Sequence, residues 1–400
     1  MLSKLGCLLF VLSFGNSFCS SQDDLPEIDT PLGRVRGYWK TLDGITYAAF
    51  EGIPYAKPPV GDLRFEESEP IPAWSGTWVA NVSYTCLQSQ VLSTIHNESG
   101  DEDCLYINVY IPEDSVKNPK ALDVIVSIHG GAFMVGSGTE FDTFLDKEAV
   151  LVSLNYRVGI LGFLSTEDDV IPGNNGMKDQ VLALKWVRDN IASFGGNPHS
   201  VTIVGLSAGG ASVHLHYFSP LSKGLFIRGI SQSGTALGPW VTKKNALQSA
   251  KKLAALMACP DSPSEELKKC LKQRPAQDLI EQVKYFYGYD IAPMTPFSPV
   301  VEKGSTNAFL DAEPYQLLKE GKVHDVPWIT SYTTGEGLLL TGVLWQKLDE
   351  VDEKWVEIFP YLLHCNETLP VSERETVAKE VLDYYMGPGE KISKNSYKEF

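Results

Sequence analysis

The passage from an apolar run into a glycine-rich turn at residues 200–209 constrains the fold of this chain more than any other feature. The run SVTIVG is typical of a strand buried on both faces of a parallel sheet, and AGGASVHLHYF after the turn is a candidate short helix. Between them lies Gly205-Leu206-Ser207-Ala208-Gly209, with glycines two residues before and after the serine. This spacing is typical of a tight strand-to-helix turn that projects a nucleophilic serine. A glycine-rich turn with a purely structural role is the alternative interpretation.

Two further apolar runs, at 121–131 and 149–156, are rich in β-branched residues like the run before Ser207. Between 178 and 196, apolar residues recur at helical spacing and a glycine pair ends the segment, which predicts a helix with a glycine C-cap. A strand, a helix and a strand at this separation predict a βαβ unit. We therefore expect an α/β fold with a central, mostly parallel sheet flanked by helices. Further strands are expected at 224–234 and 326–337, a helical insertion at 244–290, and a helical tail that breaks at Gly387.

A second glycine motif, His129-Gly130-Gly131-Ala132-Phe133, directly follows the first of these apolar runs. Because glycines lack side chains, the N–H groups of Gly130 and Gly131 can approach a substrate oxygen closely. Together with the N–H of Ala208 they could stabilise the oxyanion of a tetrahedral intermediate. An ordinary turn between a strand and a helix is the alternative. His129 belongs to this loop and is not expected to be a catalytic base.

A carboxylate that could orient a catalytic histidine is expected after the serine in chain order. Glu336, in Thr334-Gly335-Glu336-Gly337, follows the strand candidate PWITSY and is the best placed. A carboxylate at the end of a strand can orient an imidazole and stabilise its cation. The alternative is a solvated glutamate in a loop.

The N-terminal residues 1–21 predict a secretory signal peptide, because Lys4 precedes an apolar stretch and small residues follow it. A membrane anchor is the alternative, but this stretch is too short to span a bilayer. Residues 22–400 are expected to form one secreted domain. The net charge of −16 argues against nucleic acid or an anionic membrane as a partner.

Secretion makes disulfides expected. Four cysteines can pair in three ways, and two short loops, Cys86–Cys104 and Cys259–Cys270, are the simplest choice; Cys365 is then left single. Three sequons are candidates for glycosylation in surface loops, at Asn81, Asn97 and Asn366. The histidines and cysteines lack metal-ligand spacing, so neither a metal nor a cofactor is expected.

Residues 28–400 resemble the type-B carboxylesterase and cholinesterase family of α/β-hydrolases, and within it the secreted, esterase-6-like insect carboxylesterases. The resemblance is carried by the glycine motifs above together with FEGIPYA at 50–56, GDLRF at 61–65, EDCLYINV at 102–109 and FGGNP at 194–198. It implies that Ser207 is the nucleophile, Glu336 the triad acid, and Gly130, Gly131 and Ala208 the oxyanion hole. It also implies that Ser233 supports the acid, that Trp240 lines an acyl pocket, and that Arg64 and Glu102 form a structural ion pair. The two short disulfides coincide with those of the family.

Three departures from the family pattern affect the expected function. Leu206 stands where the family commonly has glutamate, and residues 87–103 contain no tryptophan to hold a quaternary ammonium group, so choline esters are not expected substrates. The base histidine of the family lies well beyond the acid, whereas the one histidine after Glu336 is His364, which we expect at the surface. We therefore expect the sequence to be truncated, with the C-terminal part of the fold missing.

The leading hypothesis is a carboxylesterase that hydrolyses a small-molecule carboxylic ester through an acyl-enzyme on Ser207. The alternative is a non-catalytic, secreted, cholinesterase-like binding or adhesion protein. Loss of the nucleophile would favour that alternative, and Ser207 is intact. A chain too unstable to fold alone is a third possibility. The sequence predicts neither the ester nor the oligomeric state.

Overall fold

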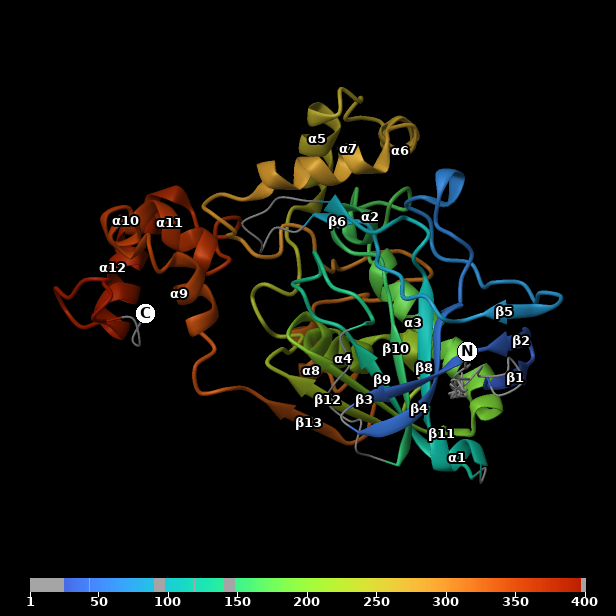
Figure 1. Cartoon of the computed structure of the whole chain (residues 1–400). Coiled ribbons are helices and arrows are strands. Elements are labelled where there is room, and N and C mark those ends of the chain that lie inside the picture. Colours follow the sequence, from blue (N-terminus) through green and yellow to red (C-terminus); the bar gives the residue numbers. More distant parts are fainter. Residues whose placement is uncertain (1–24, 43, 90–97, 118–119, 140–147, 397–400) are drawn as a thin grey trace, which may run out of the picture.

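The computed structural model describes residues 25–42, 44–89, 98–117, 120–139 and 148–396. The predicted signal peptide and Asn97 lie outside these ranges. Within them, eight strands form one central sheet in the order β13-β12-β11-β9-β10-β8-β4-β3 (Figure 1). The bounds of these strands are β3 Tyr38–Leu42, β4 Ile45–Pro54, β8 Tyr106–Pro112, β9 Leu122–Ile128, β10 Ala149–Leu154, β11 Gly196–Leu206, β12 Arg228–Gln232 and β13 Trp328–Ser331.

The sheet is mixed. Strands β13, β12, β11, β9 and β10 are parallel to their neighbours, whereas β8, β4 and β3 continue the sheet in antiparallel fashion. The parallel half contains the apolar runs that predicted strands, and β10 is buried along its whole length, as expected of a strand covered on both faces. The expectation of an α/β fold with a mostly parallel central sheet is confirmed, with the antiparallel strands gathered at one end.

Helices α3 (Asn175–Asn190) and α4 (Ala208–Phe218) pack against the parallel strands. Helix α3 lies where the helical periodicity predicted it, and after a short 3-10 turn Gly195 adopts the left-handed conformation with φ of 78°. That φ is unfavourable for a residue with a side chain, which explains the glycine. Helix α4 is buried along its whole length.

The remaining elements surround this sheet. Two small sheets are formed by β1 (Glu27–Thr30), β2 (Gly33–Arg36) and β5 (Thr77–Val79), and by β6 (Gln88–Ser89) and β7 (Glu98–Ser99). The other helices before the C-terminal region are α1 (Glu113–Lys117), α2 (Gly159–Phe163), α5 (Ala246–Leu256), α6 (Ser264–Lys272), α7 (Ala276–Glu281) and α8 (Pro314–Lys319). The 3-10 turns are η2 (Gly61–Leu63), η3 (Ile191–Phe194), η4 (Pro220–Ser222), η5 (Gln282–Phe286) and η6 (Val371–Glu373). Helices α5, α6 and α7 form the predicted insertion and lie together in Figure 1.

The C-terminal helices have a hydrophobic cluster of their own. They are α9 (Leu338–Leu344), α10 (Leu348–Glu353), α11 (Trp355–Leu362) and α12 (Arg374–Tyr385). Val351, Phe359 and Ala378 are fully buried among them, and Ala292 is the member of this cluster that comes from an earlier part of the chain. In Figure 1 these helices lie together beside the part of the molecule that contains the sheet. No helix in the described ranges has the length and apolar character needed to cross a membrane.

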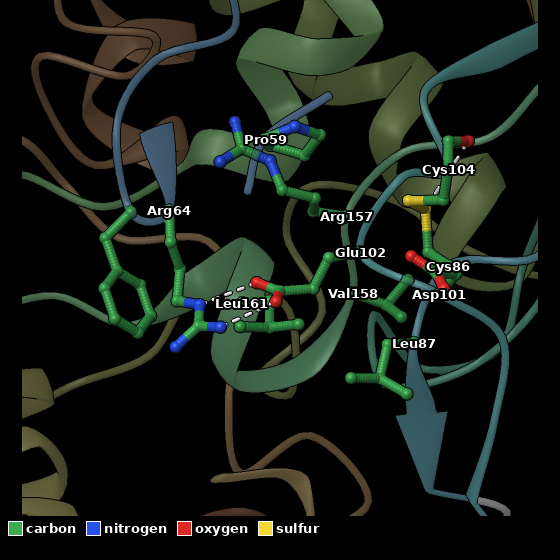
Figure 2. A pocket seen from close by; sticks show the side chains of 11 residues that line it. Pro59, Arg64, Cys86, Leu87, Asp101, Glu102, Cys104, Arg157, Val158 and Leu161 are labelled. Atoms are coloured by element: carbon green, nitrogen blue, oxygen red, sulfur yellow. Dashed lines mark hydrogen bonds and ion pairs between the residues drawn. A yellow bond between two sulfur atoms is a disulfide. The ribbon is translucent and has the colours of Figure 1, made fainter. Parts of the chain in front are cut away.

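Disulfides and buried ion pairs hold the loops near the sheet. The structure contains the disulfides Cys86–Cys104 and Cys259–Cys270, and Cys365 is a free thiol. Figure 2 shows Arg64 facing Glu102 in a small pocket next to the first disulfide. The guanidinium donates to both carboxylate oxygens at 2.6 Å. It also donates to the carbonyl oxygen of Arg274 at 2.6 Å, so the Arg64 side chain joins the N-terminal loops to the helical insertion.

Candidate active site

Ser207 lies at the turn between β11 and α4. Its backbone has φ of 57° and ψ of −121°, a strained conformation for a residue with a side chain. The Ser207 N–H donates to the carbonyl oxygen of Gln232 at 2.8 Å, and the Ser207 carbonyl accepts from the N–H of Ala211 at 2.9 Å. A Cβ at Gly205 would lie 2.3 Å from the carbonyl oxygen of Gly209. Gly205 is therefore required by the close approach of strand and helix.

The glycine loop after β9 lies directly beside Ser207. A Cβ at Gly130 would be 3.4 Å from the Cβ of Ser207 and 2.6 Å from the carbonyl oxygen of Leu206. Gly131 has φ of 100°, and a Cβ there would be 2.1 Å from the carbonyl oxygen of Val135. Neither glycine could be replaced without moving backbone. The N–H of Ala208 belongs to the first turn of α4, where backbone donors have no partner within the helix.

Glu336 is held by two hydrogen bonds to a single carboxylate oxygen. The Oγ of Ser233 donates to Oε1 at 2.7 Å, and the N–H of Thr333 donates to the same atom at 2.7 Å. The bond from Ser233, assisted by Thr333, lowers the pKa of Glu336 below its usual value. Glu336 is exposed and is therefore ionised at neutral pH.

The loop after β12 connects Glu336 to Ser207. Ser233 has φ of 52°, and its N–H donates to the carbonyl oxygen of Ser331 at the end of β13. A Cβ at Gly234 would lie 2.0 Å from the carbonyl oxygen of Ser207. Both Gly130 and Gly234 therefore lie close to Ser207.

All these groups lie at one edge of the sheet. Strands β13, β12, β11 and β9 are consecutive parallel neighbours, so their carboxyl ends share one edge. Glu336, Ser233, Ser207 and Gly130 each follow a different one of these strands. The carboxyl edge of a parallel sheet is where such folds place their ligands and reacting groups. Sequence reasoning missed the roles of Gln232 and Thr333, because both act through the main chain and carry no side-chain signal.

In the described part of the chain, no histidine hydrogen-bonds to Ser207 or Glu336. His129 stacks on Tyr156, and burial lowers its pKa to about 4. His216 contacts Ser222 and Gln180, and His324 contacts the Ser219 carbonyl. His199 lies near the amino end of the sheet, in the first half of β11, and His96 lies outside the described residues.

His364 follows α11 in the C-terminal helices. The expectation that it lies at the surface is wrong: it is half-buried, and burial, with the nearby charge of Lys243, lowers its pKa to about 4. Nothing in its contacts connects His364 to Ser207 or Glu336.

The residues predicted to contact substrate differ in exposure. Leu206 is 56% exposed immediately before Ser207, so an apolar side chain borders the nucleophile. Trp240 is half-buried and lies with its ring centroid 6.2 Å from that of Phe133, in the glycine loop. The sequons differ as well: Asn81 is exposed and Asn366 is half-buried.

A serine on a strained strand-to-helix turn, at the carboxyl edge of a mixed sheet and beside a glycine loop, defines an α/β-hydrolase. The comparisons agree. The structure of juvenile hormone esterase from Manduca sexta, with OTFP covalently attached, superposes with a TM-score of 0.82 at 31% identity, covering 94% of this chain and 72% of that chain.

The model of the carboxylesterase family matches residues 24–400. Venom carboxylesterase-6 from Apis mellifera is 44% identical over 399 residues, covering 96% of this chain and 71% of that protein. Juvenile hormone esterase from Tribolium castaneum is 37% identical, covering 98% of this chain and 69% of that protein. The chain belongs to the carboxylesterase family, and its activity is carboxylic ester hydrolysis. These findings favour the enzyme over a non-catalytic binding protein.

Proposed function

We propose that Ser207 is the nucleophile of this ester hydrolase, and that the N–H groups of Gly130, Gly131 and Ala208 form its oxyanion hole. The observation that carries the proposal is the position of Gly130 against the Cβ of Ser207. As a base takes its proton, Ser207 Oγ attacks the acyl carbonyl. The tetrahedral intermediate breaks its bond to the alcohol oxygen, which leaves as the alcohol with that proton, and the acyl-enzyme remains. Water then hydrolyses the acyl-enzyme and releases the acid. Donors held in place for the developing oxyanion are each worth about 3 kcal/mol in such sites.

We propose further that Glu336 is the acid of the triad and that Ser233 supports it. A carboxylate with a lowered pKa stays ionised while it orients an imidazole and stabilises the imidazolium. The base in this mechanism is a histidine that takes the proton of Ser207. None of the described histidines is assigned to that role, because none of them hydrogen-bonds to Ser207 or Glu336.

The substrate we propose is an uncharged carboxylic ester with apolar substituents. Leu206 offers a cation no partner next to Ser207. The hollow beside Gly131 is lined by apolar residues, namely Ala132, Met134, Val135, Tyr287, Ile291 and Met294. Trp240 lies with its ring centroid 6.2 Å from that of the buried Phe133, in the same glycine loop. Two of the relatives are named juvenile hormone esterases, but the lining of this site does not distinguish one apolar ester from another.

We also propose that the protein is secreted after cleavage near residues 20–22, and that Asn81, Asn97 and Asn366 accept glycans. The two disulfides support an oxidising compartment. N-terminal sequencing of the secreted protein, and its mass before and after glycosidase treatment, test this proposal. A secreted protein that retains residue 1 would contradict the cleavage.

The test of the nucleophile is labelling by an organophosphonate, followed by mass spectrometry of the modified peptide. We expect slow labelling of Ser207 in the wild-type chain, none in Ser207→Ala, and unchanged labelling in Ser75→Ala, which removes an exposed serine far along the chain from the site. No labelling of the wild type, or equal labelling of Ser207→Ala, would contradict the proposal.

A further inference from the structure

We propose that His214 is a positioning residue that holds the loop after β12, and through it the carboxylate of Glu336, in place beside Ser207. This inference deepens the function proposed above and rests on it. His214 was not among the residues expected to have a role, because a histidine inside a short apolar helix is ordinarily a core residue.

His214 occupies α4, about two turns after Ser207, and its side chain is buried. The N–H of Ala236 donates to its Nδ1 at 3.1 Å. The ring also stacks on Trp328, with centroids 4.1 Å apart and planes 24° from parallel. One side chain therefore contacts both the loop after β12 and the first residue of β13.

Both contacts lead to Glu336. Ala236 ends the tight segment that begins at Ser233, whose Oγ donates to the Glu336 carboxylate. Trp328 begins β13, and the chain after β13 carries Thr333, whose N–H is the second donor to the same oxygen. Ser233 and Thr333, the two donors to Glu336, thus belong to the loop after β12 and the chain after β13. His214 contacts the first of these segments and the strand that leads into the second. Ser207 directly precedes the first turn of α4. Through α4, the imidazole of His214 therefore links the nucleophile to the two segments that hold the acid.

The chemistry of the contact requires a neutral ring. Since Nδ1 accepts a hydrogen bond, the single ring proton is on Nε2. Burial lowers the pKa of His214 to about 4, which agrees with the neutral form at physiological pH. Phenylalanine would keep the stack on Trp328 but lose the acceptor, whereas asparagine would lose the ring and keep an acceptor oxygen near the position of Nδ1. The two variants separate the hydrogen bond from packing.

The first readout is the pKa of Glu336, measured by ¹³C NMR on protein labelled at glutamate carboxyls and assigned with Glu336→Gln. We expect His214→Phe to raise this pKa toward the ordinary 4.5 and His214→Asn to keep it near the wild-type value. Phe218→Leu is the matched control, because the Phe218 ring lies 5.0 Å from the His214 ring without a hydrogen bond to the loop. It should lower the melting temperature and leave the pKa of Glu336 unchanged.

The second readout is the rate of organophosphonate labelling of Ser207. We expect His214→Phe to slow this labelling about tenfold, because small misplacements of reacting groups cost at least that much. We expect His214→Asn to keep most of the wild-type rate.

An unchanged Glu336 pKa in His214→Phe, or an equal shift in Phe218→Leu, overturns the inference. A wild type that shows no labelling, with a Glu336 pKa that still responds to His214→Phe, overturns the proposed nucleophile and supports the positioning role. Should His214→Phe not fold, ¹⁵N NMR of the wild-type imidazole decides, and a protonated Nδ1 at neutral pH contradicts the contact.

Discussion

Gly209 and Ile128 touch through their backbones: a Cβ at Gly209 would lie 2.1 Å from the carbonyl oxygen of Ile128. Ile128 is the last residue of β9, and Gly209 lies in the first turn of α4. The contact brings the start of the glycine loop, which follows Ile128, against the helix that follows Ser207. Gly209, the second glycine of the serine motif, thus allows the neighbouring loop to approach the helix closely.

Gly209→Ala is therefore expected to push the glycine loop away from Ser207. We expect at least a hundredfold slower organophosphonate labelling, because a displacement of about 1 Å has that effect in active sites, and a loss of about 1–3 kcal/mol in unfolding free energy from overpacking. Gly342→Ala is the matched control, since a Cβ there meets nothing within 4 Å. Wild-type labelling by Gly209→Ala would show that the loop tolerates the extra methyl.

Added imidazole is expected to accelerate Ser207-dependent ester hydrolysis by the 400-residue chain. No described histidine hydrogen-bonds to Ser207. Without a base only residual catalysis from the oxyanion hole is expected, and free imidazole can accept the proton of Ser207. The measurement is hydrolysis of p-nitrophenyl acetate with and without imidazole, after subtraction of the rate with Ser207→Ala. If imidazole leaves this difference unchanged, the base is already present in the chain.

Asp179→Asn is expected to destabilise the protein by about 3–5 kcal/mol, because it leaves a buried guanidinium unpaired. Asp179 is fully buried and accepts hydrogen bonds from the Nε, Nη2 and backbone N–H of Arg157. The control is Asp189→Asn, which breaks an exposed pair with Arg188 and should cost less than about 1 kcal/mol. Urea unfolding measures both, and equal costs would contradict the assignment of a buried pair.

Glu51 makes the stability of the antiparallel strands sensitive to acid. Burial alone would raise its pKa, but hydrogen bonds from Lys40, Tyr38 and Tyr110 outweigh burial and lower the pKa below 4.5. The unfolded chain then binds more protons than the folded one, so this contribution is complete above pH 4.5 and is lost as the pH falls through the lowered pKa.

Glu51→Gln should therefore cost about 2 kcal/mol at pH 7 and progressively less as the pH falls below 4.5. The measurement is the unfolding free energy in urea at a series of pH values. Glu69→Gln, which removes an exposed partner of Lys57, is the control and should change little at any pH. A cost for Glu51→Gln that is constant with pH would contradict the lowered pKa.

The parallel half of the fold could be predicted from sequence, and the antiparallel half could not. Strands β9, β10 and β11 are continuous apolar runs, which is the direct signal of burial on both faces. Strand β4 contains Glu51, Gly52 and Pro54, residues that argue against a buried strand. It forms because tyrosine and lysine side chains from neighbouring strands satisfy Glu51, a compensation that a linear pattern does not reveal.

Some residues of the candidate site could likewise be predicted from the sequence, and others could not. Glycine spacing indicated Ser207 and Gly130, because positions where two backbones approach closely require glycine. Chain order indicated Glu336, and resemblance to a family indicated Ser233. The contributions of Thr333 and His214 depend on a loop amide and on ring stacking between distant segments, and neither produces a pattern in the sequence.

Strand β13 ends the sheet within the described residues, and Ile329 at its centre is 62% exposed. A strand edge of this kind can pair with the edge of another molecule and seed aggregation. The net charge of −16 opposes such encounters by mutual repulsion, and added salt screens that repulsion. The protein should therefore self-associate least in dilute, low-salt buffer above its isoelectric point. Concentrating it in high salt should promote self-association through this strand.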